Sequence, residues 1–131
     1  MKTLLCIDDD EWVLETLHEA LILQGYRVLT TKTAAEAPAF LRVAKVDLVL
    51  LDLNMPGKNG FTLFRELRAV AAVPILFVSA CSRSFNAESP AFVDLYQHEF
   101  REGRTDILYK PFALSLLYEK VESLIGEAVA A

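Results

Sequence analysis

A short run of apolar residues, Leu48 to Leu51, restricts the possible folds of this chain more than any other feature. The run has no polar alternation, and it is followed by Asp52 and by a segment with the turn formers Pro56 and Gly60. An apolar run of this length, bounded by turn signals, is typical of a parallel strand that is buried on both faces. We therefore predict a central strand of an open α/β sheet, with Asp52 at its carboxyl end.

The remaining sequence alternates between strand and helix patterns around this central strand. Asp10 is a predicted cap of the first helix, and Gly25 a predicted stop. Thr33 and Glu36 resemble a capping box at the start of the second helix, but Pro38 lies past the first turn, so this helix is expected to begin late or bend. Further strands are predicted at residues 4–7, 26–30, 73–79 and 106–111, and helices at residues 10–25, 33–44, 61–69, 91–102 and 113–129.

Length and charge restrict the class of protein. With 131 residues and 53% hydrophobic content, the chain is expected to form one domain over residues 1–131. The net charge of −5 comes with no basic run, which argues against direct binding to nucleic acid and favours protein partners. No signal peptide or membrane span is recognisable, so we expect a cytoplasmic protein without a membrane anchor. Cys6 and Cys81 match neither a disulfide framework nor a metal-ligand spacing, and reduced thiols are expected.

Polar residues stand at the ends of four of the five predicted strands. Strand ends are exposed, which by itself explains one polar residue at such a position. A set is harder to explain in this way, because right-handed crossovers bring all carboxyl ends of a parallel sheet to one edge, where ligand sites of such sheets lie. The residues of this set are Asp8, Asp9, Asp52, Ser79 and Lys110.

Three carboxylates at one edge repel one another unless a cation neutralises them. Magnesium prefers carboxylate, carbonyl and water oxygens, and one or two carboxylates plus a substrate phosphate commonly hold it. Three carboxylates, one Mg²⁺ and Lys110 have a formal charge of zero, so an anionic phosphoryl group can approach Asp52. We interpret Asp52 as the reactive residue, with Lys110 and the Ser79 hydroxyl on the phosphoryl oxygens.

These residues together resemble the signature of receiver domains of two-component response regulators. The resemblance covers essentially the whole chain, and four motifs in order at strand ends are highly specific. It implies a flavodoxin-like fold, a doubly wound five-stranded parallel sheet with strand order 2-1-3-4-5. The motifs are Asp8-Asp9, the run from Leu51 to Pro56 with Gly60 behind it, Ser79-Ala80, and Lys110-Pro111-Phe112.

The resemblance also implies roles for individual residues. A histidine kinase or phosphotransfer protein would phosphorylate Asp52, and the domain would catalyse its own magnesium-dependent phosphorylation and dephosphorylation. Asp9, Asp52 and the backbone carbonyl of Asn54 would bind Mg²⁺ directly, and Asp8 through water. Ser79 and Lys110 would bind the phosphoryl group, with Ala80 and Asn54 beside it, and the Lys110-Pro111 bond would be cis.

Two features depart from the family pattern. Receivers usually carry Tyr or Phe at the position of Ile107, where rotation of the ring reports phosphorylation. Lys110 also follows Ser79 by 31 residues, a longer spacing than usual, and the extra chain lies in residues 81–103. Because Ile107 is β-branched and smaller than an aromatic residue, it cannot copy the ring motion. We therefore expect the atypical segment 81–103 to carry the signal to a downstream protein target.

Other functions remain open from sequence. A degenerate receiver could keep the site and act as a constitutive protein-binding module. An aspartate-nucleophile phosphatase shares the Asp, Ser, Lys and magnesium, but it requires a second acid two residues after the nucleophile, where this chain has Asn54. For the oligomeric state we expect a monomer or a weak homodimer.

Overall fold

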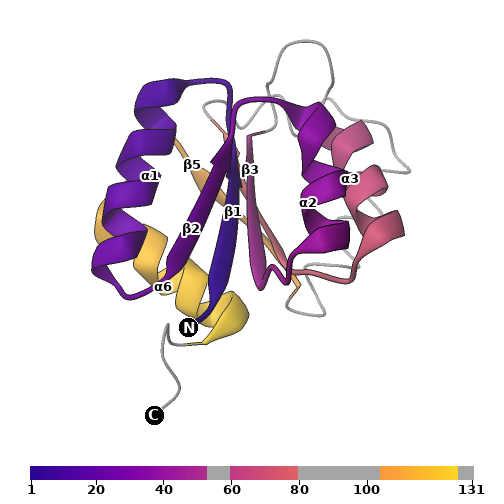
Figure 1. The fold of residues 1–131 in the computed structure, drawn as a ribbon. Coiled ribbons are helices and arrows are strands. Elements are labelled where there is room, and N and C mark those ends of the chain that lie inside the picture. Colours follow the sequence, from indigo (N-terminus) through magenta and orange to yellow (C-terminus); the bar gives the residue numbers. More distant parts are fainter. Residues whose placement is uncertain (53–59, 80–103, 127–131) are drawn as a thin grey trace.

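The chain forms a parallel β-sheet with helices on both faces, as Figure 1 shows. The computed structural model describes residues 1–52, 60–79 and 104–126. Five strands follow the order β2-β1-β3-β4-β5 and all neighbours pair in parallel, which confirms the predicted doubly wound, flavodoxin-like topology. The strands are β1 (Thr3–Ile7), β2 (Arg27–Thr31), β3 (Leu48–Asp52), β4 (Ile75–Ser79) and β5 (Thr105–Tyr109).

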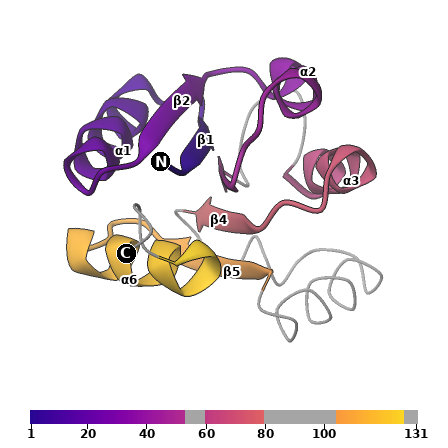
Figure 2. The same cartoon turned by 60° about the horizontal axis from the view of Figure 1, so that its bottom comes forward.

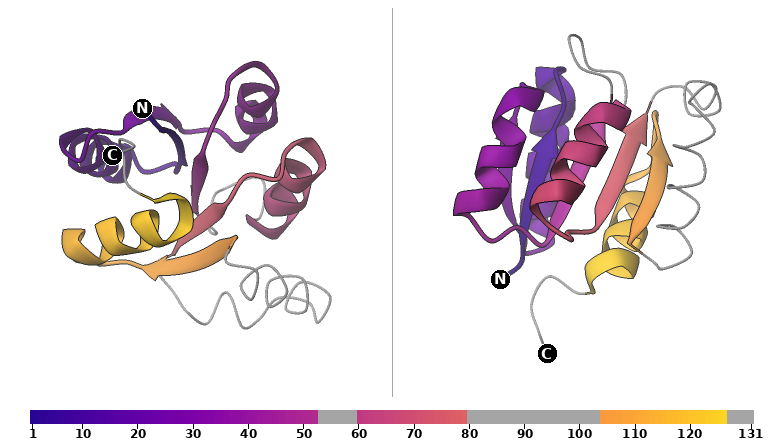
Figure 3. Two further views of the ribbon diagram at one scale, coloured as in Figure 1. Left: turned by 90° about the horizontal axis from the view of Figure 1, so that it is seen from below. Right: turned by 90° about the vertical axis from the view of Figure 1, so that its right-hand side faces the viewer.

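The helices lie in two layers on opposite faces of the sheet. α1 and α6 cover one face, and α2 and α3 cover the other, as the views in Figure 2 and Figure 3 show. The described helices are α1 (Glu11–Leu23), the short 3₁₀ helix η1 (Ala34–Glu36), α2 (Ala37–Val43), α3 (Gly60–Val70) and α6 (Leu114–Ile125). The helix that we predict at residues 91–102 lies outside the described residues.

The central strand β3 is buried on both faces, as its sequence predicts. Leu48 and Leu50 pack with the residues of α1 and α6, while Val49 and Leu51 pack with those of α2 and α3. Alternate side chains of a strand point to opposite faces, so a continuous apolar run supplies both halves of the core. Asp52, the last residue of β3, ends this run at the carboxyl edge of the sheet.

Helix α1 begins where the sequence predicts its cap. The Asp10 carboxylate accepts hydrogen bonds from the backbone N–H groups of Trp12, at 2.9 Å, and Val13, at 3.4 Å. Gly25 follows the helix with a φ of 94°, a left-handed conformation that favours glycine. This cap fixes the path of the chain just after Asp8 and Asp9, and therefore the position of the acidic pair.

The predicted capping box of the second helix is wrong. The Glu36 carboxylate accepts a hydrogen bond from the Thr31 hydroxyl, at 3.0 Å, and Thr33 donates its backbone N–H to the same hydroxyl, at 3.2 Å. The α-helix starts only at Ala37, with Pro38 in its first turn and no side-chain cap. The late start agrees with the expectation for Pro38, because a proline is tolerated where the N–H has no helical partner.

Candidate functional site

Asp8 lies directly after β1 and is buried, with 2% of its surface exposed. One carboxylate oxygen, Oδ1, accepts the backbone N–H of Asp10 at 2.9 Å, and the other, Oδ2, accepts Lys110 Nζ at 2.9 Å. Its own backbone N–H donates to the carbonyl of Thr31 at 3.2 Å, which ties the residue to β2. A buried charge needs such partners, because desolvation alone is costly.

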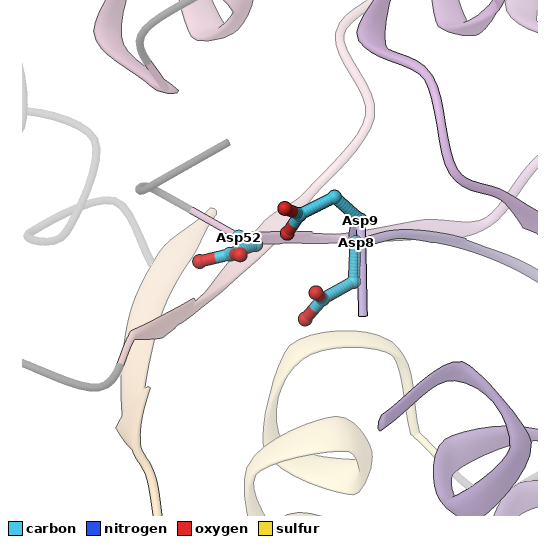
Figure 4. A group of neighbouring side chains, drawn as sticks. All are labelled: Asp8, Asp9 and Asp52. Carbon is cyan, nitrogen blue, oxygen red and sulfur yellow. The ribbon is translucent and has the colours of Figure 1, made fainter. Parts of the chain in front are cut away.

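Asp8, Asp9 and Asp52 form one carboxylate cluster, shown in Figure 4. One oxygen of each carboxylate lies within 4.8 Å of the others, although Asp52 comes from β3 and the other two follow β1. Asp9 is exposed, whereas Asp52 is buried with 6% of its surface exposed. The structure therefore brings together the three carboxylates that the sequence predicts at the sheet edge, in an arrangement that a hard divalent cation such as Mg²⁺ fits.

Lys110 follows β5 and is the cation of this cluster. Its Nζ atom lies 2.9 Å from Asp8 Oδ2 and 3.9 Å from Asp52 Oδ2, and its side chain is 20% exposed. The three carboxylates and Lys110 sum to a formal charge of −2, which one divalent cation cancels. A divalent cation bound here would therefore cancel the negative charge that otherwise repels an anionic group from Asp52.

The backbone places Ser79 next to this cluster. Ser79 ends β4, and the preceding residue, Val78, pairs in register with Asp52. The roles predicted for Asn54 and Ala80 fall on residues outside the described part of the chain, as does the side chain of Ser79. The Lys110-Pro111 peptide bond is cis, as the family resemblance implies.

Cys6 lies on β1 two residues before Asp8 and is completely buried. Desolvation by burial, with the nearby negative charge of Asp8 as a second cause, raises the pKa of its thiol from 9.0 to about 12. A thiol with this pKa is neutral at physiological pH, and a neutral thiol is a poor nucleophile. Cys6 is therefore a core residue beneath the site, and Cys81 lies outside the described residues.

A family model confirms the class of protein that this fold and this site indicate. The model of the response regulator receiver domain matches residues 4–122. The chain belongs to this family.

Two curated bacterial proteins are similar to this chain over about half of their own length. Protein PetR of Rhodobacter capsulatus is 33% identical over 131 residues, which cover 98% of this chain and 52% of PetR. The transcriptional regulatory protein PrrA of Mycobacterium tuberculosis is 34% identical over 122 residues, which cover 92% of this chain and 48% of PrrA. The chain thus spans about half the length of the curated relatives that it matches.

Solved structures share the fold over almost the whole chain. The response regulator TrrA of Thermotoga maritima, solved in complex with Mg²⁺-BeF, has a TM-score of 0.77 and 30% identity, with 95% of this chain and 99% of that chain covered. The non-phosphorylated receiver domain of HemR from Leptospira biflexa has a TM-score of 0.76 and 31% identity, with 100% and 99% covered. Within the three described ranges, no helix combines the length and apolar character needed to cross a membrane.

Two features of the site are not apparent from sequence. The first is the ion pair between Lys110 and Asp8, which are 102 residues apart. The second is the hydrogen bond from the Asp10 backbone to Asp8, which couples the cap of α1 to the carboxylate cluster. Asp8 and Lys110 directly follow strands and Asp10 is a predicted helix cap, and these sequence signals indicate their neighbourhood but not their pairing.

Proposed function

We propose that the chain accepts a phosphoryl group from a histidine kinase or phosphotransfer protein on Asp52, with Mg²⁺ bound, and thereby switches its binding to a downstream protein. The observation that carries this proposal is the carboxylate cluster of Asp8, Asp9 and Asp52, in which one oxygen of each residue lies within 4.8 Å of the others. The Nζ atom of Lys110 forms ion pairs with two of these carboxylates, those of Asp8 and Asp52. Membership of the receiver family supports it, as does the likeness to TrrA, which was solved with Mg²⁺-BeF.

The proposed reaction is an in-line phosphoryl transfer. A carboxylate oxygen of Asp52 attacks the phosphorus of a phosphohistidine, and the P–N bond breaks as the O–P bond forms. The imidazole nitrogen takes the electron pair of the broken bond and is then protonated by solvent. Dephosphorylation is the attack of water on the acyl phosphate, which releases inorganic phosphate and restores the Asp52 carboxylate.

The residues of the site have different proposed roles, in binding the metal or the phosphoryl group, according to their positions. Asp8, Asp9 and Asp52 are the carboxylates that would hold Mg²⁺, which neutralises charge on the transferring group. Lys110 follows β5 and reaches Asp52 at 3.9 Å, so a small movement brings its ammonium group onto a phosphoryl oxygen at that residue. We assign the Ser79 hydroxyl to a second phosphoryl oxygen, because the end of β4 lies beside the end of β3.

Incubation with acetyl phosphate, with and without Mg²⁺, tests the proposal. Intact mass should increase by one phosphoryl group only with Mg²⁺, and Asp52→Asn should abolish the increase. Lys110→Ala should still accept the group but lose the amide spectral changes that follow in the wild type. Labelling of Asp52→Asn at another residue, or identical spectral changes in wild type and Lys110→Ala, would contradict these assignments.

A constitutive binding module is the second candidate function, and Ile107 favours it. Ile107 packs against the apolar cluster under α2 and α3, in the position where receivers usually have an aromatic switch. Phosphorylation of Asp52 that leaves hydrogen exchange unchanged throughout the chain would support this candidate over a switch.

A further inference from the structure

The backbone of Asp8 is held from the outer side of the sheet by the end of β2. The Asp8 N–H donates to the carbonyl of Thr31, the last residue of β2, at 3.2 Å. The carboxylate of Asp8 is held separately, by the backbone of Asp10 and by Lys110. Among the described strands, β2 lies at the edge of the sheet and pairs with β1 alone. The backbone position of Asp8 therefore depends on the contacts that fix the end of β2.

The Thr31 hydroxyl is the centre of these contacts. Thr31 is buried, with 6% of its surface exposed. Its hydroxyl accepts the backbone N–H of Thr33 at 3.2 Å, and it lies 3.0 Å from Glu36 Oε2 and 3.3 Å from the carbonyl oxygen of Thr33. A hydroxyl has one hydrogen, and a carboxylate is the stronger acceptor, so this hydrogen is donated to Glu36. One side chain thus ties the last residue of β2 to the following turn and to η1.

A second contact at the end of β2 reaches α1. Lys32 directly follows Thr31, and its Nζ atom lies 3.1 Å from Oε2 of Glu11, the first residue of α1. The side chains of this ion pair are 53% and 68% exposed, and exposed pairs contribute little to stability. The hydrogen bonds of the buried Thr31 hydroxyl are therefore the stronger support for the end of β2.

The position of Asp8 matters because its carboxylate belongs to the cluster that fits a divalent cation. One oxygen of each of Asp8, Asp9 and Asp52 lies within 4.8 Å of the others. Mg²⁺ requires near-ideal octahedral coordination, so a small displacement of one carboxylate lowers its affinity for the ion. Groups that hold metal ligands in place commonly affect metal affinity without touching the metal. A shift of the Thr31 carbonyl would therefore reach the cluster through the Asp8 backbone.

We propose that Thr31 is a positioning residue for the carboxylate cluster. Its hydroxyl, anchored on Glu36, holds in place the β2 carbonyl that fixes the Asp8 backbone, and thereby sets the affinity of the site for Mg²⁺. Neither Thr31 nor Glu36 touches the reacting atoms, because both act through Asp8. This inference rests on the proposed function only in taking Mg²⁺ as the cation of the site.

Titration with Mg²⁺ alone, followed in amide NMR spectra, tests the role of the hydroxyl. Thr31→Val keeps the β-branched shape and removes the hydroxyl, so the Kd for Mg²⁺ should rise about fivefold. Hydrogen exchange of the Asp8 amide should accelerate about tenfold relative to that of Leu5, which is completely buried in β1 and reports global opening. Thr31→Ser restores a hydroxyl and should return both quantities to within about twofold of the wild type.

Two further sets of variants separate positioning from folding. Thr30→Val makes the same chemical change one residue earlier, at an exposed position, and should leave the Kd for Mg²⁺ unchanged. Glu36 is also exposed, so Glu36→Ala removes the acceptor of the hydroxyl without disturbing a buried side chain. Its Kd should rise about threefold, while Glu36→Gln keeps an acceptor oxygen and should bind Mg²⁺ like the wild type.

Phosphorylation by acetyl phosphate gives a second readout. Thr31→Val should need more Mg²⁺ for half its maximal rate, yet reach a rate within about twofold of the wild type at saturating Mg²⁺, because Asp52 and Lys110 are unchanged. A purely structural role would instead lower the urea midpoint of Thr31→Val and leave its Kd for Mg²⁺ unchanged.

The outcomes are distinct from those that test the proposed function. An unchanged Kd in Thr31→Val and Glu36→Ala, an equal rise in Thr30→Val, or no recovery in Thr31→Ser would overturn the positioning role. If Thr31→Val does not fold, the comparison of Glu36→Ala with Glu36→Gln decides, and equal Kd values in these two would overturn it. A wild type that binds no Mg²⁺ would also overturn it, whereas one that binds Mg²⁺ without phosphorylation of Asp52 rejects only the proposed function.

Discussion

Lys110 and Asp8 form an ion pair that joins the end of β5 to the end of β1, with 2.9 Å between Lys110 Nζ and Asp8 Oδ2. The same nitrogen is 3.9 Å from Asp52 Oδ2, so the lysine is closer to the buried carboxylate of Asp8 than to the proposed phosphoacceptor. Asp8 also belongs to the carboxylate cluster that fits Mg²⁺. A Mg²⁺ ion bound by this cluster would therefore share the Asp8 carboxylate with Lys110, and we expect the stability of the domain to depend on the cation.

Lys110→Met should destabilise the domain by about 3 kcal/mol without metal, because it leaves Asp8 buried without its cationic partner. Mg²⁺ should raise the Tm of this variant more than that of the wild type, since the metal replaces the missing positive charge. Thermal unfolding with and without Mg²⁺ measures both effects. The control is Lys120→Met, which breaks the Lys120–Asp106 pair at 3.1 Å away from the cluster; an equal magnesium effect in the two variants would contradict the prediction.

Asp10→Ala should lower the free energy of unfolding by about 1 kcal/mol, because the Trp12 and Val13 N–H groups lose their side-chain acceptor. Urea denaturation measures this loss. Glu11→Ala is the neighbouring control and should change stability by less than about 0.5 kcal/mol, since its ion pair with Lys32 is exposed. A larger loss in Glu11→Ala than in Asp10→Ala would show that the helix dipole, not the cap, stabilises this end.

Cys6 should make the domain less stable as pH rises above 9. Between pH 9 and about 12 the thiol ionises in the unfolded chain but stays protonated in the folded one, because burial raises its pKa to about 12. The unfolded state then binds fewer protons, so stability falls by up to about 1.4 kcal/mol per pH unit in this range. Urea denaturation should be compared between the Cys81→Ser variant and the same variant with Cys6→Ala added. The free energy of unfolding should depend less on pH in the protein that carries Cys6→Ala, and parallel pH profiles would contradict this.

Phosphorylation should change hydrogen exchange in residues 81–103, because Ile107 cannot perform the motion of an aromatic ring. Hydrogen exchange measured by mass spectrometry on the free domain and on the domain phosphorylated in the presence of Mg²⁺ checks this. Asp52→Asn treated with the same phosphodonor is the control and should remain unchanged. Changes confined to β5, around Ile107, would instead indicate that the usual route operates with a smaller side chain.

The sequence alone determined the five strands and the approximate limits of α1. The apolar run Leu48–Leu51 predicts β3, and Asp10 and Gly25 predict the limits of α1, because strand periodicity and helix capping act over a few residues. The order of strands and the convergence of Asp8, Asp9 and Asp52 also follow, the order from the family resemblance and the convergence from the geometry of parallel sheets.

Only the tertiary structure decided which side chains pair. The capping box at Glu36 failed because Thr31, brought near by the end of β2, offers its hydroxyl to the same carboxylate. The ion pair between Lys110 and Asp8 joins residues that are 102 positions apart in the sequence. Such contacts depend on the register of the strands and the packing of α1 and α6, because side-chain interactions act over a few ångströms of space and not along the chain.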